Sequence, residues 1–184
     1  MPFEIPSSWE WVRLGNVCKK EIRRGKSPIY ATENTNTLVF AQKCNTKSGK
    51  IDFSLAKFLD ESVFKKYNED DYLNKGDIII NSTGTGTLGR ICILRDDLKF
   101  LIVPDSHVMI VRIINLLSIL YIYYFLKFNQ KYLEKHGEGS TNQKELKSSI
   151  VSNLLIPLPP LAEQKRIVAK IEELFKIIEP LTEK

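Results

Sequence analysis

Leu154-Leu-Ile-Pro-Leu-Pro-Pro-Leu-Ala-Glu-Gln-Lys-Arg-Ile167 is the stretch that divides this chain into two structurally different parts. Its three prolines cannot continue a helix, so the first half of the stretch follows an extended path. From Leu161 to Glu179, apolar residues recur every three or four positions with charged residues between them, which predicts a long helix. We therefore expect one mixed domain at residues 1–156, and a proline hinge with a spacer or dimerisation helix at 157–184.

The apolar face of this predicted helix has the spacing of a coiled-coil seam. Ile167, Ile171, Leu174 and Ile178 step by four, three and four residues, which matches a heptad pattern. A helix that follows a rigid proline segment projects readily, so we expect the seam to be exposed and to mediate self-association or partner docking. Packing of this face against the chain's own domain is the alternative. Pro180 is expected to end or kink the helix early.

The chain before residue 116 is dominated by short apolar runs that predict strands. They are rich in β-branched residues and bounded by Gly, Asn, Asp or Pro, as in strands joined by long loops. We expect a twisted, mostly antiparallel sheet or partial barrel, with a short helix at residues 57–67 packed against it. The runs are Trp9–Leu14, Thr37–Phe40, Asp77–Ile80, Gly89–Leu94 and His107–Ile113.

After residue 116 the pattern becomes helical. Apolar and aromatic residues between Leu116 and Lys135 have helical spacing, and Gly137 is a natural stop. Asn142 and Glu145 are spaced as a capping box, which predicts a second, short helix at residues 144–149. The predicted fold class is therefore α+β, with packed helices on the sheet and a long C-terminal helix of coiled-coil type.

Composition limits the class of protein. With 184 residues, 43% of them hydrophobic and 27% charged, the chain is long enough for one globular domain and an appendage. The longest apolar stretch, Ile113–Leu126, is too short to cross a membrane and predicts a buried amphipathic helix. The N-terminus lacks the features of a signal peptide, and three cysteines without a CxxC pair favour neither disulfides nor zinc. We expect a cytoplasmic protein.

Positive charge is concentrated in one segment. The net charge is +5, but residues 19–50 carry eight basic residues against Glu21 and Glu33, which gives +6. Residues 51–81 carry four basic and seven acidic residues, which gives −3. A local basic patch of this kind is typical of a polyanion site. A solvated surface loop is the alternative.

Three stretches together resemble the specificity subunit of type I restriction-modification systems. They are Pro2–Gly15, then Gly76–Arg90 with Val103–His107, and then Gly139–Asn142 through Ile156–Ile167. They occur in the family's order and cover most of the chain. The Pro-Pro-Leu-x-Glu-Gln junction into the long helix, at residues 159–164, is the most specific of them.

The resemblance implies a target recognition domain followed by a spacer helix, with double-stranded DNA and a methyltransferase subunit as partners. A restriction subunit would join through the methyltransferase. Family members usually carry two such domains and two such helices, each domain reading half of a split site, whereas this chain holds one of each. A truncated gene product, an excised half or a natural half-subunit that pairs with itself would each explain the difference. Self-pairing through the helices would give a palindromic split site.

The candidate DNA-binding residues lie in basic or hydroxyl-rich segments. Arg and Lys pair with guanine edges and Gln or Asn with adenine, while hydroxyls and free amides bind phosphates. A structural turn at residues 83–90 and simple helix capping near 139–144 are the alternatives. The candidates are Arg23, Arg24, Lys26, Gln42, Lys43, Lys47, Thr83, Thr85, Arg90, Ser140, Thr141, Asn142 and Lys144.

No catalytic centre, metal site or cofactor is expected. Gly84, Gly86 and Gly89 match GxGxxG, but no P-loop lysine follows and the next segment predicts a strand. Pro104-Asp105 with Glu145-Leu-Lys147 matches a PD…ExK nuclease pattern, which is short enough to arise by chance. A protein-interaction adaptor that acts through the coiled coil is the other alternative, and it leaves the basic patch unexplained.

Overall fold

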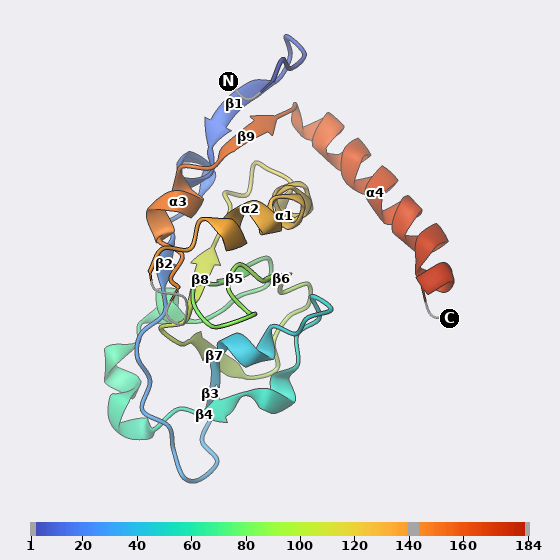
Figure 1. Cartoon of the computed structure of the whole chain (residues 1–184). Helices are drawn as coiled ribbons and strands as arrows, with labels where there is room; N and C mark the ends of the chain where they lie inside the picture. Colours follow the sequence, from blue (N-terminus) through green and yellow to red (C-terminus); the bar gives the residue numbers. More distant parts are fainter. Residues whose placement is uncertain (1–2, 140–143, 183–184) are drawn as a thin grey trace.

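The structure, a computed structural model, describes residues 3–139 and 144–182 and shows a mixed α/β domain from which one long helix projects (Figure 1). The strands are β1 (Glu10–Arg13), β2 (Arg23–Arg24), β3 (Thr37–Phe40), β4 (Lys57–Phe58), β5 (Ile78–Asn81), β6 (Ile91–Ile93), β7 (Leu101–Pro104), β8 (Val108–Val111) and β9 (Leu155–Leu158). The α-helices are α1 (Ile119–Phe128), α2 (Gln130–Lys135), α3 (Ser148–Ser152) and α4 (Leu161–Thr182). The 3₁₀ turns are η1 (Leu14–Val17), η2 (Gln42–Cys44), η3 (Phe53–Leu55), η4 (Glu61–Lys66) and η5 (Glu69–Asp71).

A four-stranded antiparallel sheet with the order β2-β8-β5-β6 forms the centre of the domain. Side chains alternate between its two faces, as the period of a strand requires. Ile78 and Ile80 of β5 enter a core that α1 and α2 cover, whereas Ile79 enters a second core that contains Phe40 of β3. All three isoleucines are fully buried, at about 1.5–3 kcal/mol each. Burial on both faces explains the uninterrupted apolar sequence of β5.

A second sheet, β4-β3-β7, packs on the other face of the first through the core that contains Phe40, Ile79 and Ile102. The turn η4 covers its outer side, where Val63 joins a third, small core. Strand β7, which the sequence did not predict, pairs parallel with β3. The other ladders of the described residues are antiparallel, as expected. Both sheets are open, so of the two expected forms the mostly antiparallel sheet is found and no closed barrel forms: the first sheet ends at β2 and β6 and does not join β3.

The helix expected at residues 116–135 forms, but it is broken into α1 and α2 at Asn129. The Asn129 side chain donates from Nδ2 to the carbonyl of Phe125 (2.9 Å) and competes with the helical bonding pattern. The helix expected at residues 57–67 is wrong, because the segment forms the short strand β4 and then the 3₁₀ turn η4.

The helix expected at residues 144–149 starts only at Ser148, as α3. Glu145 exchanges two backbone hydrogen bonds with Glu138 (2.7 and 2.9 Å), which holds it in an extended conformation. Asn142, the other member of the expected capping box, lies outside the described residues.

Strand β9 pairs with β1, so the two ends of the domain meet where α4 begins (Figure 1). Gln164 then fixes the first turn of α4: its Oε1 accepts from the backbone N–H of Ser118 (3.0 Å), and its Nε2 donates to the carbonyl of Pro159 (2.8 Å). Gln164 is buried, and Val168, one turn later, packs into the same core as α1. The start of α4 is therefore attached rigidly to the domain.

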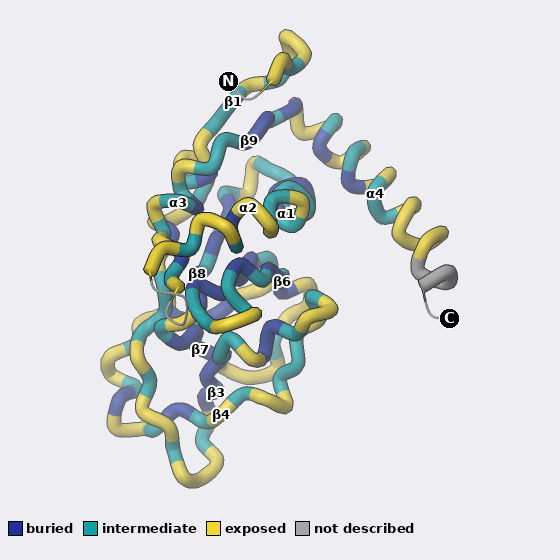
Figure 2. The backbone as a smooth tube through the Cα atoms, in the orientation of Figure 1, coloured by how far each residue is buried: buried dark blue, intermediate teal, exposed yellow. Residues whose placement is uncertain are grey.

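The second half of α4 leaves the domain (Figure 2). Glu172 is the last described residue of α4 whose side chain hydrogen-bonds to the domain. Its Oε1 accepts from Arg95 Nη1 (3.3 Å) and from the hydroxyl of Tyr124 (3.1 Å). Beyond it, the apolar side chains Leu174, Phe175, Ile177 and Ile178 are between 45% and 59% exposed. The backbone stays helical to Thr182, so the expectation that Pro180 ends the helix is wrong. Across the described residues, no helix combines the length and apolar character that a membrane crossing requires.

A buried ion pair fastens β8 to the start of β5. Arg112 donates from Nε to Asp77 Oδ1 and from Nη2 to Asp77 Oδ2, both at 2.7 Å. The same Nη2 donates to the carbonyl of Tyr72 (2.8 Å), and Asp77 Oδ2 also accepts from the N–H of Asn74 (2.8 Å). Asp77 is 1% exposed, so removal of one partner leaves an uncompensated charge in the interior.

We predict that Asp77→Ala lowers the free energy of unfolding by about 3–5 kcal/mol, as expected when a buried pair loses one partner. Asp97→Ala is the matched control, because the Lys75–Asp97 pair is exposed and its loss costs about 1 kcal/mol or less. Urea unfolding measures both variants. Equal losses in the two variants would contradict this role of the buried pair.

Candidate nucleic-acid interface

Gln42, the first residue of η2, joins two of the predicted recognition segments. Its Oε1 accepts from the hydroxyls of Thr83 (3.4 Å) and Thr87 (3.3 Å), and its backbone carbonyl accepts from Nδ2 of Asn81 (3.0 Å). Among the described residues, none accepts a hydrogen bond from Gln42 Nε2. The amide is therefore held by its oxygen and keeps both N–H donors for a ligand.

Arg90 braces the loop between β5 and β6. Its Nη1 donates to the carbonyl of Asn45 (3.2 Å) and its Nη2 to the carbonyl of Gly86 (2.8 Å). The Asn45 side chain in turn donates from Nδ2 to the carbonyl of Arg90 (3.0 Å) and to Asn81 Oδ1 (3.2 Å). The guanidinium thus uses two of its N–H donors in hydrogen bonds to backbone carbonyls. This geometry fits a structural role better than a base contact.

Arg24 extends this surface to the edge strand β2. Its guanidinium forms an ion pair with Glu145, which in turn lies opposite Thr83 in an isolated antiparallel bridge. The hydroxyl of Thr83 also hydrogen-bonds to Nδ1 of His107 (2.8 Å). Segments far apart in the sequence therefore meet here, from β2, η2, the β5–β6 loop and residue 145.

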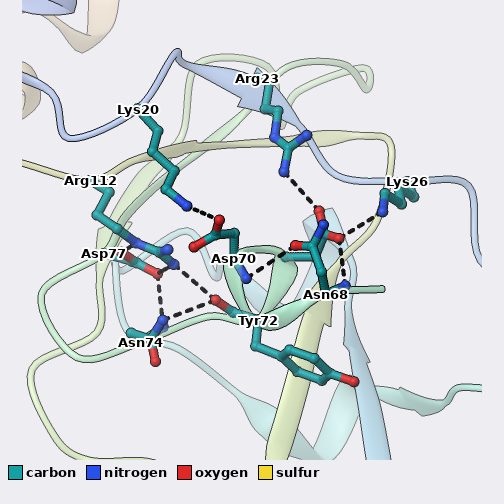
Figure 3. Close-up of polar contacts among 10 residues, drawn as sticks. Lys20, Arg23, Lys26, Asn68, Asp70, Tyr72, Asn74, Asp77 and Arg112 are labelled. Carbon is teal, nitrogen blue, oxygen red and sulfur yellow. Dashed lines mark hydrogen bonds and ion pairs between the residues drawn. The ribbon is translucent and has the colours of Figure 1, made fainter. Parts of the chain in front are cut away.

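Arg23 precedes Arg24 in β2 and so points to the opposite face of the strand. There the acidic turn η5 holds three basic side chains (Figure 3). Lys20 forms an ion pair with Asp70, and Asp71 accepts from Arg23 Nη2 (2.8 Å) and from Lys26 Nζ (2.6 Å). The excess charge of the basic segment is thus partly neutralised by the acidic segment that follows it in the sequence.

Asp71 is ionised although it is only 7% exposed. Burial raises the pKa of this carboxyl, but hydrogen bonds from Lys26 and from the backbone N–H of Asn68, with the charges of Lys26 and Arg23, outweigh that effect. The resulting pKa lies below the ordinary value of 3.8. A permanently charged acceptor therefore lies beside Arg23.

Gly25 explains how the β2 segment sits so close to the sheet. A Cβ on this residue would lie 2.1 Å from the carbonyl oxygen of Pro104 and 2.5 Å from that of Asp105. Its N–H donates to the carbonyl of Val108 (3.1 Å). Because no side chain fits at this position, Arg24 and Lys26 are fixed on either side of a backbone contact.

The glycines of the β5–β6 loop shape a hollow of about 320 Å³ beside α2. Gly84, Gly86 and Gly89 all have positive φ angles, between 72° and 101°, which only glycine adopts easily. Thr85 and Lys144 line the hollow. A hydroxyl and an ammonium at a glycine turn suit a phosphate contact.

Lys43 and Lys47 project from η2 and the turn after it. Both are exposed, and neither side chain forms a hydrogen bond or ion pair with another described residue. They differ in this from Arg23, Arg24 and Lys26, which all have carboxylate partners. The unpaired lysines are free to contact phosphate.

The structure thus places six of the ten described candidates in two groups, one on each side of β2. Arg24, Gln42, Thr83 and Arg90 belong to one connected hydrogen-bonded network. Ser140, Thr141 and Asn142 lie outside the described residues, so their predicted role stays a prediction.

Sequence reasoning missed the acidic partners that organise these groups, Asp71 and Glu145. The excess of acidic residues between 51 and 81 was the available signal, but charge counts do not show which groups pair. Two residues of the nuclease pattern also have partners: Glu145 forms an ion pair with Arg24, and Lys147 forms one with Glu138 (2.5 Å). In the described part of the chain, no group of His, Cys, Asp or Glu side chains is arranged to hold a metal ion.

Half of the predicted seam residues on α4 are packed and half are exposed. Ile167 packs partly against the domain core, and Ile171 is half-buried. Leu174 and Ile178 are 45% and 47% exposed. The seam therefore begins as part of the domain and continues as a free apolar face, and its role as an interface stays a prediction.

The fold matches a known class of proteins. The family model for the type I restriction modification DNA specificity domain matches residues 6–184, so the chain belongs to this family. This confirms the family that the three stretches of the sequence indicate.

Particular relatives include specificity subunits of type I restriction enzymes. The chain is 24% identical over 178 residues to the MjaVIII specificity subunit of Methanocaldococcus jannaschii, and 25% identical over 187 residues to the EcoEI specificity subunit of Escherichia coli. The matches cover 95% and 98% of this chain but 37% and 31% of those proteins. The chain thus spans about a third of the length of these relatives.

Solved structures show the same fold. One, from a study of complex assembly and conformational transition of the type I R-M system, aligns over 99% of this chain and 42% of its own, with a TM-score of 0.77 and 23% identity. Another, the HsdS subunit of Thermoanaerobacter tengcongensis, aligns over 99% and 41%, with a TM-score of 0.67 and 22% identity.

We predict that Gly25→Ala lowers the free energy of unfolding by about 1–3 kcal/mol, because the new methyl group overlaps the carbonyls of Pro104 and Asp105. Ser27→Ala is the control, since Ser27 is an exposed neighbour in the same segment. Urea midpoints compare the two variants. A Gly25→Ala protein as stable as wild type would show that β2 does not need this close approach.

Proposed function

We propose that this chain recognises a specific sequence in double-stranded DNA, as the specificity subunit or half-subunit of a type I restriction-modification complex. It carries no catalytic centre in this proposal. It directs a methyltransferase subunit, and through it a restriction subunit, to a split DNA site. The observation that carries the proposal is the connected polar surface of β2, η2 and the β5–β6 loop, and the family membership supports it.

The surface has the two kinds of groups that sequence-specific binding needs. Exposed Lys43 and Lys47 suit phosphate contacts, which fix register without reading sequence. Gln42 and, on the other face of β2, Arg23 have side chains that are held at one atom and keep further N–H donors, which suits hydrogen bonds to base edges. Side chains that are already ordered lose less entropy on binding.

The long helix has a separate task in this proposal. Residues 1–156 act as the target recognition domain, and residues 157–184 act as hinge and spacer or dimerisation helix. The exposed apolar side chains after Glu172 are the contact for a second copy or for the methyltransferase subunit. Two copies joined in this way would read a palindromic split site.

A protein-interaction adaptor is the second candidate, because the exposed half of α4 would serve it equally well. Salt separates the two candidates. Binding through phosphates releases counterions, so the affinity falls steeply with salt concentration, whereas an apolar interface has no such slope.

Selection from a pool of duplexes with a randomised centre tests the proposed function. The purified chain, alone and with a type I methyltransferase subunit from the same organism, is incubated with the pool, and bound duplexes are sequenced. We expect enrichment of one defined motif, and a motif with two separated halves when the chain self-associates. Binding without any enriched motif, or no salt-sensitive binding, would contradict the proposal.

For the phosphate contacts, we predict that Lys43→Ala with Lys47→Ala weakens binding to all duplexes about equally. The slope of log affinity against log salt should fall by about 2, since each phosphate contact contributes about 0.9. Lys170→Ala on the exposed face of α4 is the control and leaves the slope unchanged. A loss confined to the selected motif would instead identify these lysines as base-reading residues.

For the helix, we predict that Leu174→Asn with Ile178→Asn abolishes self-association or capture of the methyltransferase, with little change in the unfolding midpoint. Val168→Asn is the contrasting variant: it places an amide in the core, so it lowers the midpoint. Sedimentation and thermal unfolding are the two measurements. Assemblies that survive the double substitution would show that α4 is not the contact.

A further inference from the structure

We propose that Asp71 is a positioning residue for DNA recognition, and that it orients Arg23 toward one base of the target. The proposal rests on the function proposed above and adds a residue and a base-reading geometry to it. Nothing in the chain's sequence assigns a role to Asp71, which lies at the end of the acidic turn η5.

The two carboxylate oxygens of Asp71 have different tasks. Oδ2 faces the domain and accepts from Lys26 Nζ (2.6 Å) and from the backbone N–H of Asn68 (2.9 Å). Lys26 is itself fixed, because it also donates to the carbonyl of Lys66 and lies over the ring of Tyr67 (5.2 Å). Oδ2 is thus anchored, and it sets the orientation of the whole carboxylate.

The other oxygen, Oδ1, accepts from Arg23 Nη2 at 2.8 Å. This is the one hydrogen bond that the Arg23 side chain makes to a described residue. A guanidinium has five N–H donors, so most of them remain available. The Arg23 side chain is 55% exposed, whereas that of Asp71 is 7% exposed, so a buried acceptor holds a cation that reaches into solvent.

Such an arrangement favours specificity over affinity. A free arginine side chain loses rotamer entropy when it is ordered, and orientation by Asp71 removes part of that cost before DNA arrives. An oriented guanidinium can form two parallel bonds to a guanine edge, and such a contact discriminates against a wrong base by on the order of tenfold or more. The negative charge of Asp71 also reduces attraction for phosphate in general.

Lys26 and Arg23 therefore have different roles although both pair with Asp71. Lys26 spends two of its three donors on the domain and belongs to the support. Arg23 uses one of its five N–H donors in the bond to Asp71 and is the residue that contacts the base.

Duplex selection from the randomised pool tests the inference with three proteins: Asp71→Asn, Arg23→Ala and the double variant. Asp71→Asn keeps the shape of the side chain and removes its charge. We expect Arg23→Ala to remove the base preference at one position of the selected motif. Asp71→Asn should weaken the preference at that same position about tenfold, and the double variant should look like Arg23→Ala.

Asp71→Asn should also bind unselected duplexes more tightly, by about threefold at moderate salt for one additional phosphate contact. Asp97→Asn is the charge control: it changes net charge equally at an exposed pair with Lys75, and it should leave the motif intact. If Asp71→Asn does not fold, Lys26→Gln tests the same support, and its effect should fall on the Arg23 position as well.

An unchanged motif in Asp71→Asn, or losses in Asp71→Asn and Arg23→Ala that fall on different positions, would overturn the inference. A further loss of base preference when Asp71→Asn is added to Arg23→Ala would also overturn the inference, because Asp71 would then act on recognition without Arg23. If the wild-type chain selects no motif at all, the proposed function itself fails and the inference with it. If the wild-type chain selects a motif and Asp71→Asn selects the same motif, the inference about Asp71 fails and the proposed function stands.

Discussion

Buried carboxylates must be paired, and this requirement organises the edge of the domain where recognition is proposed. Asp71 and Asp77 are 7% and 1% exposed, and an unpaired charge at either place would cost several kcal/mol. Their partners come from elsewhere in the chain: Arg23 lies in β2, and Arg112 directly follows β8. The pairs tie the segment between residues 68 and 77 to the central sheet. They also determine which basic side chains have a carboxylate partner.

This constraint changes the meaning of the basic segment. Counted along the sequence, residues 19–50 carry +6, which suggests a uniform positive patch. In the structure its basic residues fall into two classes. Some are fixed by carboxylates and suit directional contacts, whereas Lys43 and Lys47 have no carboxylate partner within the described residues and suit phosphates. A recognition surface needs both classes, because phosphate contacts give affinity and oriented contacts give specificity.

The sequence was informative where structure follows local pattern. Strand β3 has the predicted bounds and β5 differs by one residue at each end, because strong apolar runs between turn residues define them. Strand β7 was missed, since four residues that end in proline resemble a loop, and its parallel partner β3 lies far away in the sequence. The anchoring of α4 through Gln164 was also missed, because a buried glutamine on a helix face looks like a surface residue. Candidate contacts were predictable by type, whereas Asp71 and Glu145 as their partners were not, since only folding brings them to β2.

If β2, η2 and the β5–β6 loop form the DNA-reading surface, photo-crosslinking of the chain to its selected duplex should locate the contacts there. Photoreactive bases are placed at each position of the motif in turn, and the crosslinked peptides are identified by mass spectrometry. We expect crosslinks within residues 20–27, 42–50 and 83–90, and none from the exposed half of α4. Crosslinks confined to α4, or to the face of the domain that carries α1 and α2, would contradict it.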